Sequence, residues 1–269
     1  MRPSAVGWPV RRLRDGSLRP AEEDTLAAEE PLELRLNGRP LVVTMRTPGH
    51  DEELAVGFLV SEGILRADAT VALGRVRNPL DPAHDNIVNV SAAADALLRN
   101  PASRSFHASS ACGVCGQASL EDMERRFEPV RGALSLRHDS LLALAARMRE
   151  EQRLFERTGG LHAAALFDAH LELACLREDI GRHNAVDKVV GWAHAARRLP
   201  LAEHALVVSG RAGYEVVQKA VAAGIPLVAA VGAPSSLAAR LAEQAGVTLV
   251  GFLRERSFNV YTHAQRVIA

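Results

Sequence analysis

Several features that would narrow the function of this chain quickly are scarce or missing. Only three cysteines occur among 269 residues, so the chain is not a small disulfide-rich scaffold. Lys and Arg together number 32, as do Asp and Glu, and the formal net charge is zero. This balance argues against nucleic acid and membrane surfaces as partners. No apolar run of about 18 residues predicts a membrane helix, and no secretory h-region is found near the N-terminus. We therefore expect a cytoplasmic protein.

The composition is that of a protein with a sizeable core, with 48% hydrophobic and 24% charged residues. We expect three parts. Residues 1–27 are rich in proline, arginine and glutamate and predict a flexible, partly disordered extension. Residues 28–130 predict a small α+β domain that ends in a mobile loop. Residues 131–269 predict a larger α/β domain.

The small domain is predicted from a hairpin and a helix. Residues 32–36 and 41–45 are rich in strand-forming side chains, and Asn37-Gly38 between them favours a tight turn, because both turn positions need positive φ. Three acids at residues 51–53 favour a helix start. Strands are expected near residues 71–76 and 87–90.

The larger domain is predicted to alternate helices and strands, which favours a sheet with parallel crossovers and helices on both faces. The expected helices cover 139–155, 183–192, 214–223 and 235–245, and the expected strands cover 161–167, 171–176, 205–208, 227–231 and 247–251.

Two of the cysteines, Cys112 and Cys115, form a Cys-x-x-Cys motif within Ser-Ser-Ala-Cys-Gly-Val-Cys-Gly at residues 109–116. A thiolate there could attack a persulfide or disulfide while the second cysteine resolves or positions it. The alternative is a structural zinc site, which needs a second ligand pair, and only scattered histidines such as His107 could supply one. The spacing alone leaves both open. Cys175 lies in an apolar run and is predicted to be a core residue.

Three further segments follow predicted strands, where α/β proteins often bind ligands. Residues 181–188 hold Arg, His, Asn, Asp and Lys side chains, although a solvated turn is the alternative. Residues 209–215 form a glycine-containing turn with an arginine that could hold a phosphate, or an ordinary turn. Residues 251–261 could bind a phosphate-bearing ring compound, or form a charged surface tail.

Taken together, these segments resemble the formate dehydrogenase accessory sulfurtransferase family, of the FdhD/NarQ type. The matching stretches are residues 46–59, 109–116, 181–188, 209–211 and 258–262, within a resemblance from about residue 28 to the end. The resemblance implies that a cysteine desulfurase passes persulfide sulfur to Cys112, with Cys115 auxiliary. It further implies delivery of that sulfur to the molybdenum bis(molybdopterin guanine dinucleotide) cofactor, for formate dehydrogenase.

The same resemblance implies a homodimer, no structural metal, and a cytidine-deaminase-like three-layer C-terminal domain beside the smaller N-terminal α+β domain. It assigns cofactor binding to Gly251, Phe252, Leu253, Arg254, Glu255, Arg256 and Ser257. A zinc deaminase needs His-x-Glu and Pro-Cys-x-x-Cys at two helix starts. This chain has His183-Asn184-Ala185 and residues 210–214 there, without the glutamate or the cysteines, so deamination is not expected.

Three other functions remain open from the sequence. A cofactor-binding chaperone would hold the molybdenum cofactor without passing sulfur. A thiol–disulfide oxidoreductase would cycle a Cys112–Cys115 disulfide. A structural zinc protein would bind metal at the same cysteines.

Overall fold

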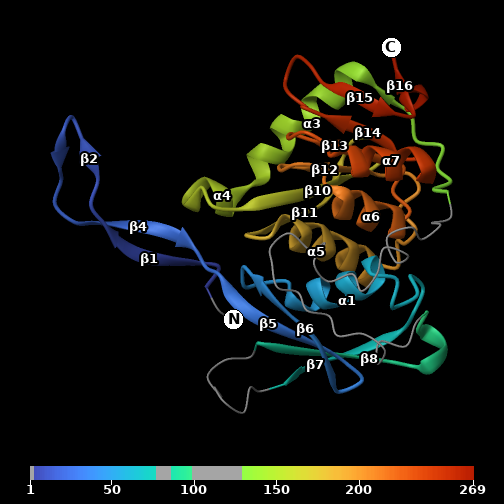
Figure 1. Ribbon diagram of the computed structural model, residues 1–269, viewed down its shortest axis with the longest axis horizontal. Coiled ribbons are helices and arrows are strands. Elements are labelled where there is room, and N and C mark those ends of the chain that lie inside the picture. Colours follow the sequence, from blue (N-terminus) through green and yellow to red (C-terminus); the bar gives the residue numbers. More distant parts are fainter. Residues whose placement is uncertain (1–2, 77–85, 99–128) are drawn as a thin grey trace.

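The computed structural model describes residues 3–76, 86–98 and 129–269 of a mixed α/β protein (Figure 1). Within them six strands form the main sheet, in the order β11 (Leu173–Asp179), β10 (His162–Phe167), β12 (Ala205–Val208), β13 (Leu227–Ala230), β14 (Thr248–Gly251) and β15 (Asn259–Thr262). The central strands β12, β13 and β14 are parallel, as expected. β10 and β11 are antiparallel instead. The five residues between them, 168–172, are too few for a parallel crossover, which takes about a dozen.

Helices cover both faces of the main sheet, because alternate strand residues point to opposite sides. One face packs against α3 (His138–Glu151) through Leu141, Leu144 and Met148. The other face packs against α5 (Arg182–Ala195), α6 (Tyr214–Ala222) and α7 (Ser236–Ala245). The sheet is therefore the middle of three layers (Figure 1).

The single helix expected over residues 139–155 is wrong in one respect. It is divided at Gln152 into α3 and α4 (Arg153–Thr158). The carboxylate of Glu178, on β11, accepts hydrogen bonds from the backbone N–H groups of Leu154 and Phe155 at 2.9 and 2.7 Å. These bonds satisfy N–H groups in the first turn of α4, so a new helix starts there.

The smaller sheet has the order β6 (Arg39–Arg46), β5 (Glu30–Leu36), β8 (Ile87–Ala92), β7 (Val71–Val76). The predicted hairpin joins β5 to β6, and Asn37 and Gly38 have φ angles of 50° and 79°. The predicted helix is α1 (Asp51–Ser61). It lies between this sheet and α5 (Figure 1).

The two sheets share one hydrophobic core, which runs from β5 and α1 into α5 and the main sheet. Two glycines let α1 and α5 approach closely. A Cβ atom at Gly57 would overlap the backbone carbonyl of Asp187, and one at Gly191 would overlap that of Glu53. The expected division at residue 130 therefore does not separate two independent cores.

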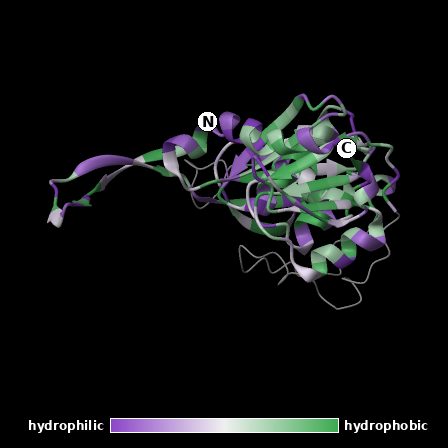
Figure 2. Ribbon diagram, turned by 90° about the horizontal axis from the view of Figure 1, so that it is seen from above, coloured by the Kyte–Doolittle hydropathy of each residue, from purple (hydrophilic) through white to green (hydrophobic). Residues whose placement is uncertain are grey.

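Residues 5–27 form a β-ribbon, not the partly disordered extension that we expected. β1 (Ala5–Val10) pairs antiparallel with β4 (Glu22–Ala27), and β2 (Leu13–Arg14) pairs with β3 (Ser17–Leu18) at the tip. Asp15 and Gly16 make the turn with positive φ angles of 52° and 74°. Asp-Gly is a hairpin signal, but the proline and arginine content around it points to disorder instead. The ribbon projects from the body of the molecule (Figures 1 and 2).

Short elements make up the rest of the secondary structure in the described residues. They are β9 (Leu136–Arg137), paired in parallel with β16 (Val267–Ile268), and single 3-10 turns at Ala94–Ala96 and Ala264–Arg266.

Candidate functional site

The predicted catalytic residues Cys112 and Cys115 lie outside the described residues, and their roles stay predictions. Cys175 lies on β11 and is 5% exposed. Burial raises the pKa of its thiol to about 12. The side chain is therefore a protonated thiol at neutral pH, whereas nucleophilic sulfur chemistry requires a thiolate. The prediction that Cys175 is a core residue is confirmed.

Arg46, at the end of β6, is fully buried and bound to the first residue of α1. Its guanidinium donates to both carboxylate oxygens of Asp51, at 2.8 and 3.1 Å. Arg75 of β7 donates to the same carboxylate at 2.9 Å. Burial alone would raise the pKa of Asp51, but the hydrogen bonds and charges of the two arginines lower it overall. These contacts fix the loop of residues 47–50.

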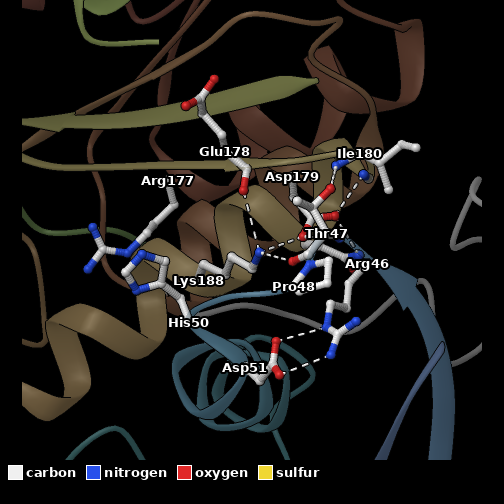
Figure 3. A network of polar contacts seen from close by, with 12 residues as sticks. Arg46, Thr47, Pro48, His50, Asp51, Arg177, Glu178, Asp179, Ile180 and Lys188 are labelled. Carbon is white, nitrogen blue, oxygen red and sulfur yellow. Dashed lines mark hydrogen bonds and ion pairs between the residues drawn. The ribbon is translucent and has the colours of Figure 1, made fainter. Parts of the chain in front are cut away.

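Lys188 and Asp179 form a second buried ion pair against that loop (Figure 3). The Lys188 ammonium lies 2.6 Å from an oxygen of Asp179, and it donates to the backbone carbonyls of Thr47 and Glu178 at 3.0 and 3.4 Å. Asp179 also accepts from the backbone N–H groups of Thr47 and Gly181, at 3.2 and 2.8 Å. A buried charge is costly unless it is paired and hydrogen-bonded, and both charges here meet that condition.

Two more contacts join the same regions. The side-chain amide of Asn184 donates to the backbone carbonyl of Met45 at 2.8 Å. Arg177 of β11 donates twice to Glu53 of α1, at 2.6 and 2.8 Å. Burial acts to raise the pKa of Glu53, but the hydrogen bonds from Arg177 and His50 outweigh it and lower the pKa to about 2.

Ion pairs and hydrogen bonds thus hold the loop after β6 against the end of β11. We call this set the buried joint; its members are Arg46, Thr47, Asp51, Asp179 and Lys188.

The segment 181–188 forms the start of α5, as predicted, and its polar residues divide into two groups. Asn184, Asp187 and Lys188 are buried, so the solvated-turn alternative is wrong for them. The Asp187 carboxylate lies 2.9 Å from the ammonium of Lys219 on α6. Arg182 and His183 stay partly exposed at the helix start.

His183 contributes to a contact between two helix starts. Its Nε2 atom lies 2.8 Å from a carboxylate oxygen of Glu215 on α6.

Within the described residues no group of three His, Cys, Asp or Glu side chains could hold a metal ion. No helix in that part of the chain is long and apolar enough to cross a membrane.

The segments 209–211 and 251–257 come together at one edge of the main sheet. The Gly232 N–H donates to the Gly210 carbonyl at 2.9 Å, and the Phe252 N–H donates to the Gly232 carbonyl at 3.1 Å. His162, the first residue of the antiparallel strand β10, pairs with Asp179 at the same edge. Sequence reasoning missed His162, because nothing local to it showed that its strand runs opposite to β12.

The predicted cofactor-binding residues 251–257 are not equivalent. Leu253 is buried in the core, and Gly251 is buried against Pro234. Arg254 is exposed, but its guanidinium donates to the backbone carbonyls of Val231 and Leu253 at 2.6 and 2.9 Å. The exposed side chains that remain are Phe252, Glu255, Arg256 and Ser257. Ligand binding by the segment stays a prediction.

The fold is that of a mixed α/β protein in which polar side chains lie at the edge where strands of the main sheet end. The model of the FdhD/NarQ family matches residues 27–268, and the chain belongs to that family.

Relatives with known names are similar over nearly their whole length. The chain is 51% identical over 255 residues to "Sulfur carrier protein FdhD" of Mycolicibacterium paratuberculosis, covering 92% of this chain and 93% of that one. It is 41% identical over 258 residues to the protein of the same name from Sulfolobus acidocaldarius, covering 96% of each. A crystal structure described as a formate dehydrogenase accessory protein from Desulfotalea psychrophila superposes with a TM-score of 0.79 at 25% identity, covering 99% of this chain and all of that one.

Proposed function

We propose that this chain is a sulfurtransferase that accepts persulfide sulfur from a cysteine desulfurase on Cys112. It delivers that sulfur to the molybdenum bis(molybdopterin guanine dinucleotide) cofactor destined for formate dehydrogenase. Relatives named as sulfur carrier proteins support sulfur transfer. The observation that carries the assignment to the Cys-x-x-Cys motif is the state of Cys175. Burial raises the pKa of its thiol to about 12, which disfavours a thiolate there and supports a role for the chain's other two cysteines.

The proposed chemistry uses two exchange steps. The Cys112 thiolate attacks the outer sulfur of the desulfurase persulfide, a sulfur–sulfur bond breaks, and the desulfurase leaves as a thiolate. Cys112 then carries a persulfide. Attack by the Cys115 thiolate on the inner sulfur of that persulfide would close a Cys112–Cys115 disulfide and release hydrosulfide. The two cysteines thereby supply the two electrons that reduce sulfane sulfur to the level of sulfide, which the molybdenum acceptor takes.

The acceptor is proposed to bind at residues 251–257. Phe252 supports this, because it is 43% exposed and its φ angle of 54° is unusual for a bulky residue. Strained backbone of this kind is often found at functional sites. An exposed aromatic ring can stack on a planar ligand, and the neighbouring Arg256 and Ser257 can donate hydrogen bonds to phosphate.

Three further properties complete the proposal. The C-terminal three-layer unit keeps a cytidine-deaminase-like frame as a binding platform, with the His183–Glu215 pair at the helix starts where a deaminase would have zinc ligands. The protein works as a homodimer, and it works in the cytoplasm. The deaminase-like frame is supported by the contact between α5 and α6. The homodimer and the cytoplasmic location rest on the resemblance stated above and on the sequence.

Formate dehydrogenase activity in cells that depend on this protein tests the proposal. Cys112→Ala is expected to reduce the activity to the level of cells without the protein. The matched control, Cys175→Ala, is expected to retain activity, since it removes a buried thiol with no proposed role. Full activity with Cys112→Ala would instead favour a cofactor-binding chaperone.

A further inference from the structure

The ribbon of residues 5–27 carries an apolar face that nothing in the described part of the chain covers. In the register of β1 and β4, Val6 lies opposite Leu26, and both share one face with Trp8. Val6, Leu26 and Trp8 are 39%, 41% and 59% exposed. The indole of Trp8 forms no hydrogen bond or ring contact with the described residues. Three exposed apolar side chains on one face, one of them a tryptophan, are typical of a surface that contacts another protein.

This face continues the apolar pattern of β5, the strand that follows the ribbon. Leu32, Leu34 and Leu36 are at most 3% exposed, because they face the hydrophobic core. Ala28 and Leu26 precede them at the same two-residue spacing, and the exposed fraction rises from 5% at Ala28 to 41% at Leu26. The rise falls where the chain leaves the body and enters the ribbon (Figure 2). The ribbon thus has the pattern of a sheet with one buried face, but it lacks the layer that would bury it.

The root of the ribbon is fixed to the body of the molecule. The hydroxyl of Ser4 donates to the backbone carbonyl of Pro48 at 3.0 Å, and the Ala28 N–H donates to the Ser4 carbonyl at 2.9 Å. On the other side, a Cβ atom at Gly160 would lie 3.7 Å from the Cβ atom of Ala27. Pro48 belongs to the loop that the buried joint holds. A partner bound to the ribbon is therefore positioned relative to the main sheet and is not tethered through a flexible segment.

Positive charge gathers at the tip of the ribbon. Residues 11–19 hold four arginines against one aspartate. Arg12 is matched by two acids nearer the root, Glu22 at 3.2 Å and Asp24 at 3.1 Å. Arg14 is exposed and forms no ion pair with an acid of the described residues. Positive charge beside an apolar face is complementary to an apolar protein surface with acidic side chains at its rim.

The size of the apolar face favours a transient partner over a second copy of this chain. A tryptophan side chain offers about 150–250 Å² of surface, so the exposed parts of Val6, Trp8 and Leu26 together come to roughly 300 Å². A stable interface buries about 800 Å² on each partner, and weak, transient encounters lie at the low end of the size range. The ribbon therefore fits a protein that binds, exchanges a group and leaves.

The proposed function requires one such encounter between two protein thiols, the transfer of sulfur from the donor. The later transfer takes place on an acceptor that is bound to this chain. We propose that the ribbon docks the cysteine desulfurase, through an apolar patch with an acidic rim on the desulfurase surface. Trp8 is the central contact, and Arg14 lies at the edge. This assignment rests on the proposed function, because it takes the donor from there. It gives a role to residues that precede the segment 27–268 matched by the family model.

The rate at which a cysteine desulfurase loads sulfur onto increasing concentrations of the full chain tests the assignment. Trp8→Ala is expected to raise the apparent KM for the chain about 10- to 100-fold, as is usual when a central aromatic contact is lost. The kcat is expected to be unchanged, because Trp8 takes no part in the exchange. Val43→Ala, at a side chain of β6 that is 51% exposed, is the matched control and is expected to keep the wild-type KM.

Two further measurements test the charge and the contact itself. Arg14→Glu is expected to raise the KM at low salt, and the increase is expected to shrink at about 0.5 M salt, because exposed charges are then screened. Arg39→Glu, at an exposed arginine of the other hairpin, is the control and is expected to behave as the wild type does. Calorimetric titration with the desulfurase in the absence of cysteine measures binding without sulfur exchange. There Trp8→Ala is expected to weaken the affinity by the same factor as it raises the KM.

Wild-type KM and wild-type affinity in Trp8→Ala would overturn the assignment, as would no binding of the desulfurase to the wild type. Sedimentation that shows a dimer of the wild type and a monomer of Trp8→Ala would overturn it in favour of a second copy of this chain. Binding to phosphatidylglycerol vesicles that is lost in Trp8→Ala would overturn it in favour of a membrane surface. A wild type that binds the desulfurase through Trp8 but takes up no sulfur would contradict the proposed function and leave the docking assignment supported.

Discussion

The buried joint lies at the same edge of the main sheet as three basic side chains, those of His162, Arg182 and Arg211, which we call the basic corner. The two regions differ in how their charges are matched. In the joint, Lys188 faces Asp179 at 2.6 Å, and Arg46 holds Asp51 through two hydrogen bonds. In the corner, Arg182 and Arg211 form no ion pair with an acid of the described residues. Paired buried charges hold the framework together, whereas the arginines beside them hold no acidic partner in place. Substitutions in the joint should therefore lower the stability of the fold strongly, whereas substitutions in the corner should hardly change it.

The largest effect is expected from Asp179→Ala, which leaves the Lys188 ammonium buried without its counter-charge. Removing one partner of a buried pair typically costs about 3–5 kcal/mol, and urea denaturation measures this loss directly. The matched control is Asp139→Ala, because Asp139 forms an exposed pair with Arg137, and such pairs contribute about 0–1 kcal/mol. Equal losses for the two variants would show that the joint is no more important to folding than a surface ion pair.

A smaller loss is expected from Gly57→Ala, where α1 crosses α5. The new Cβ atom would overlap the backbone of Asp187, and overpacking of this kind costs about 1–3 kcal/mol. Gly74→Ala on β7 is the control, since a Cβ atom there would meet nothing within 4 Å. Chemical denaturation of both variants checks the difference, and unchanged stability of Gly57→Ala would contradict the close helix crossing.

The Glu53–Arg177 pair predicts a dependence of stability on pH. The pKa of Glu53 is about 2 in the folded protein, against an ordinary value of 4.5. The carboxylate therefore contributes stability that is present above pH 4.5 and is lost as the pH falls toward 2. Urea midpoints measured between pH 5 and 3 should fall less steeply for Glu53→Gln than for the wild type. Identical slopes would mean that the pair does not stabilise the fold.

The smallest effect on stability is expected at the basic corner. Arg182→Gln and Arg211→Gln should change the free energy of unfolding by no more than about 0.5 kcal/mol, as is usual for substitutions without a structural partner. The same urea experiment serves as the measurement. A loss of unfolding free energy as large as that of Asp179→Ala would mean that these arginines stabilise the fold, and the two regions would then not differ.

Local sequence patterns predicted many of the helices, strands and turns, because the interactions that produce these elements lie within a few residues of one another. The Asn37-Gly38 turn, the acidic start of α1 and the alternation of β12, α6, β13 and α7 are of this kind. The division of α3 from α4 could not be predicted in the same way. It depends on Glu178, which comes from a strand more than 20 residues away.

The candidate site shows the same limit. The burial of Cys175 followed from its apolar neighbours and was predicted. The contact of Thr47 with Asp179 spans 132 residues, and no spacing within either segment indicates it. Leu253 and Arg254 were grouped with ligand-binding residues, since a sequence does not show which side of a turn faces the core. His162 lies at the corner because β10 runs antiparallel to β12, and no local sequence pattern shows that direction.

Mass spectrometry of the full chain after incubation with a cysteine desulfurase and cysteine tests the central claim most directly. The account predicts a gain of one sulfur atom located on Cys112 in the wild type and in Cys175→Ser, and no gain in Cys112→Ser. Sulfur located on Cys175, or an undiminished gain in Cys112→Ser, would contradict it.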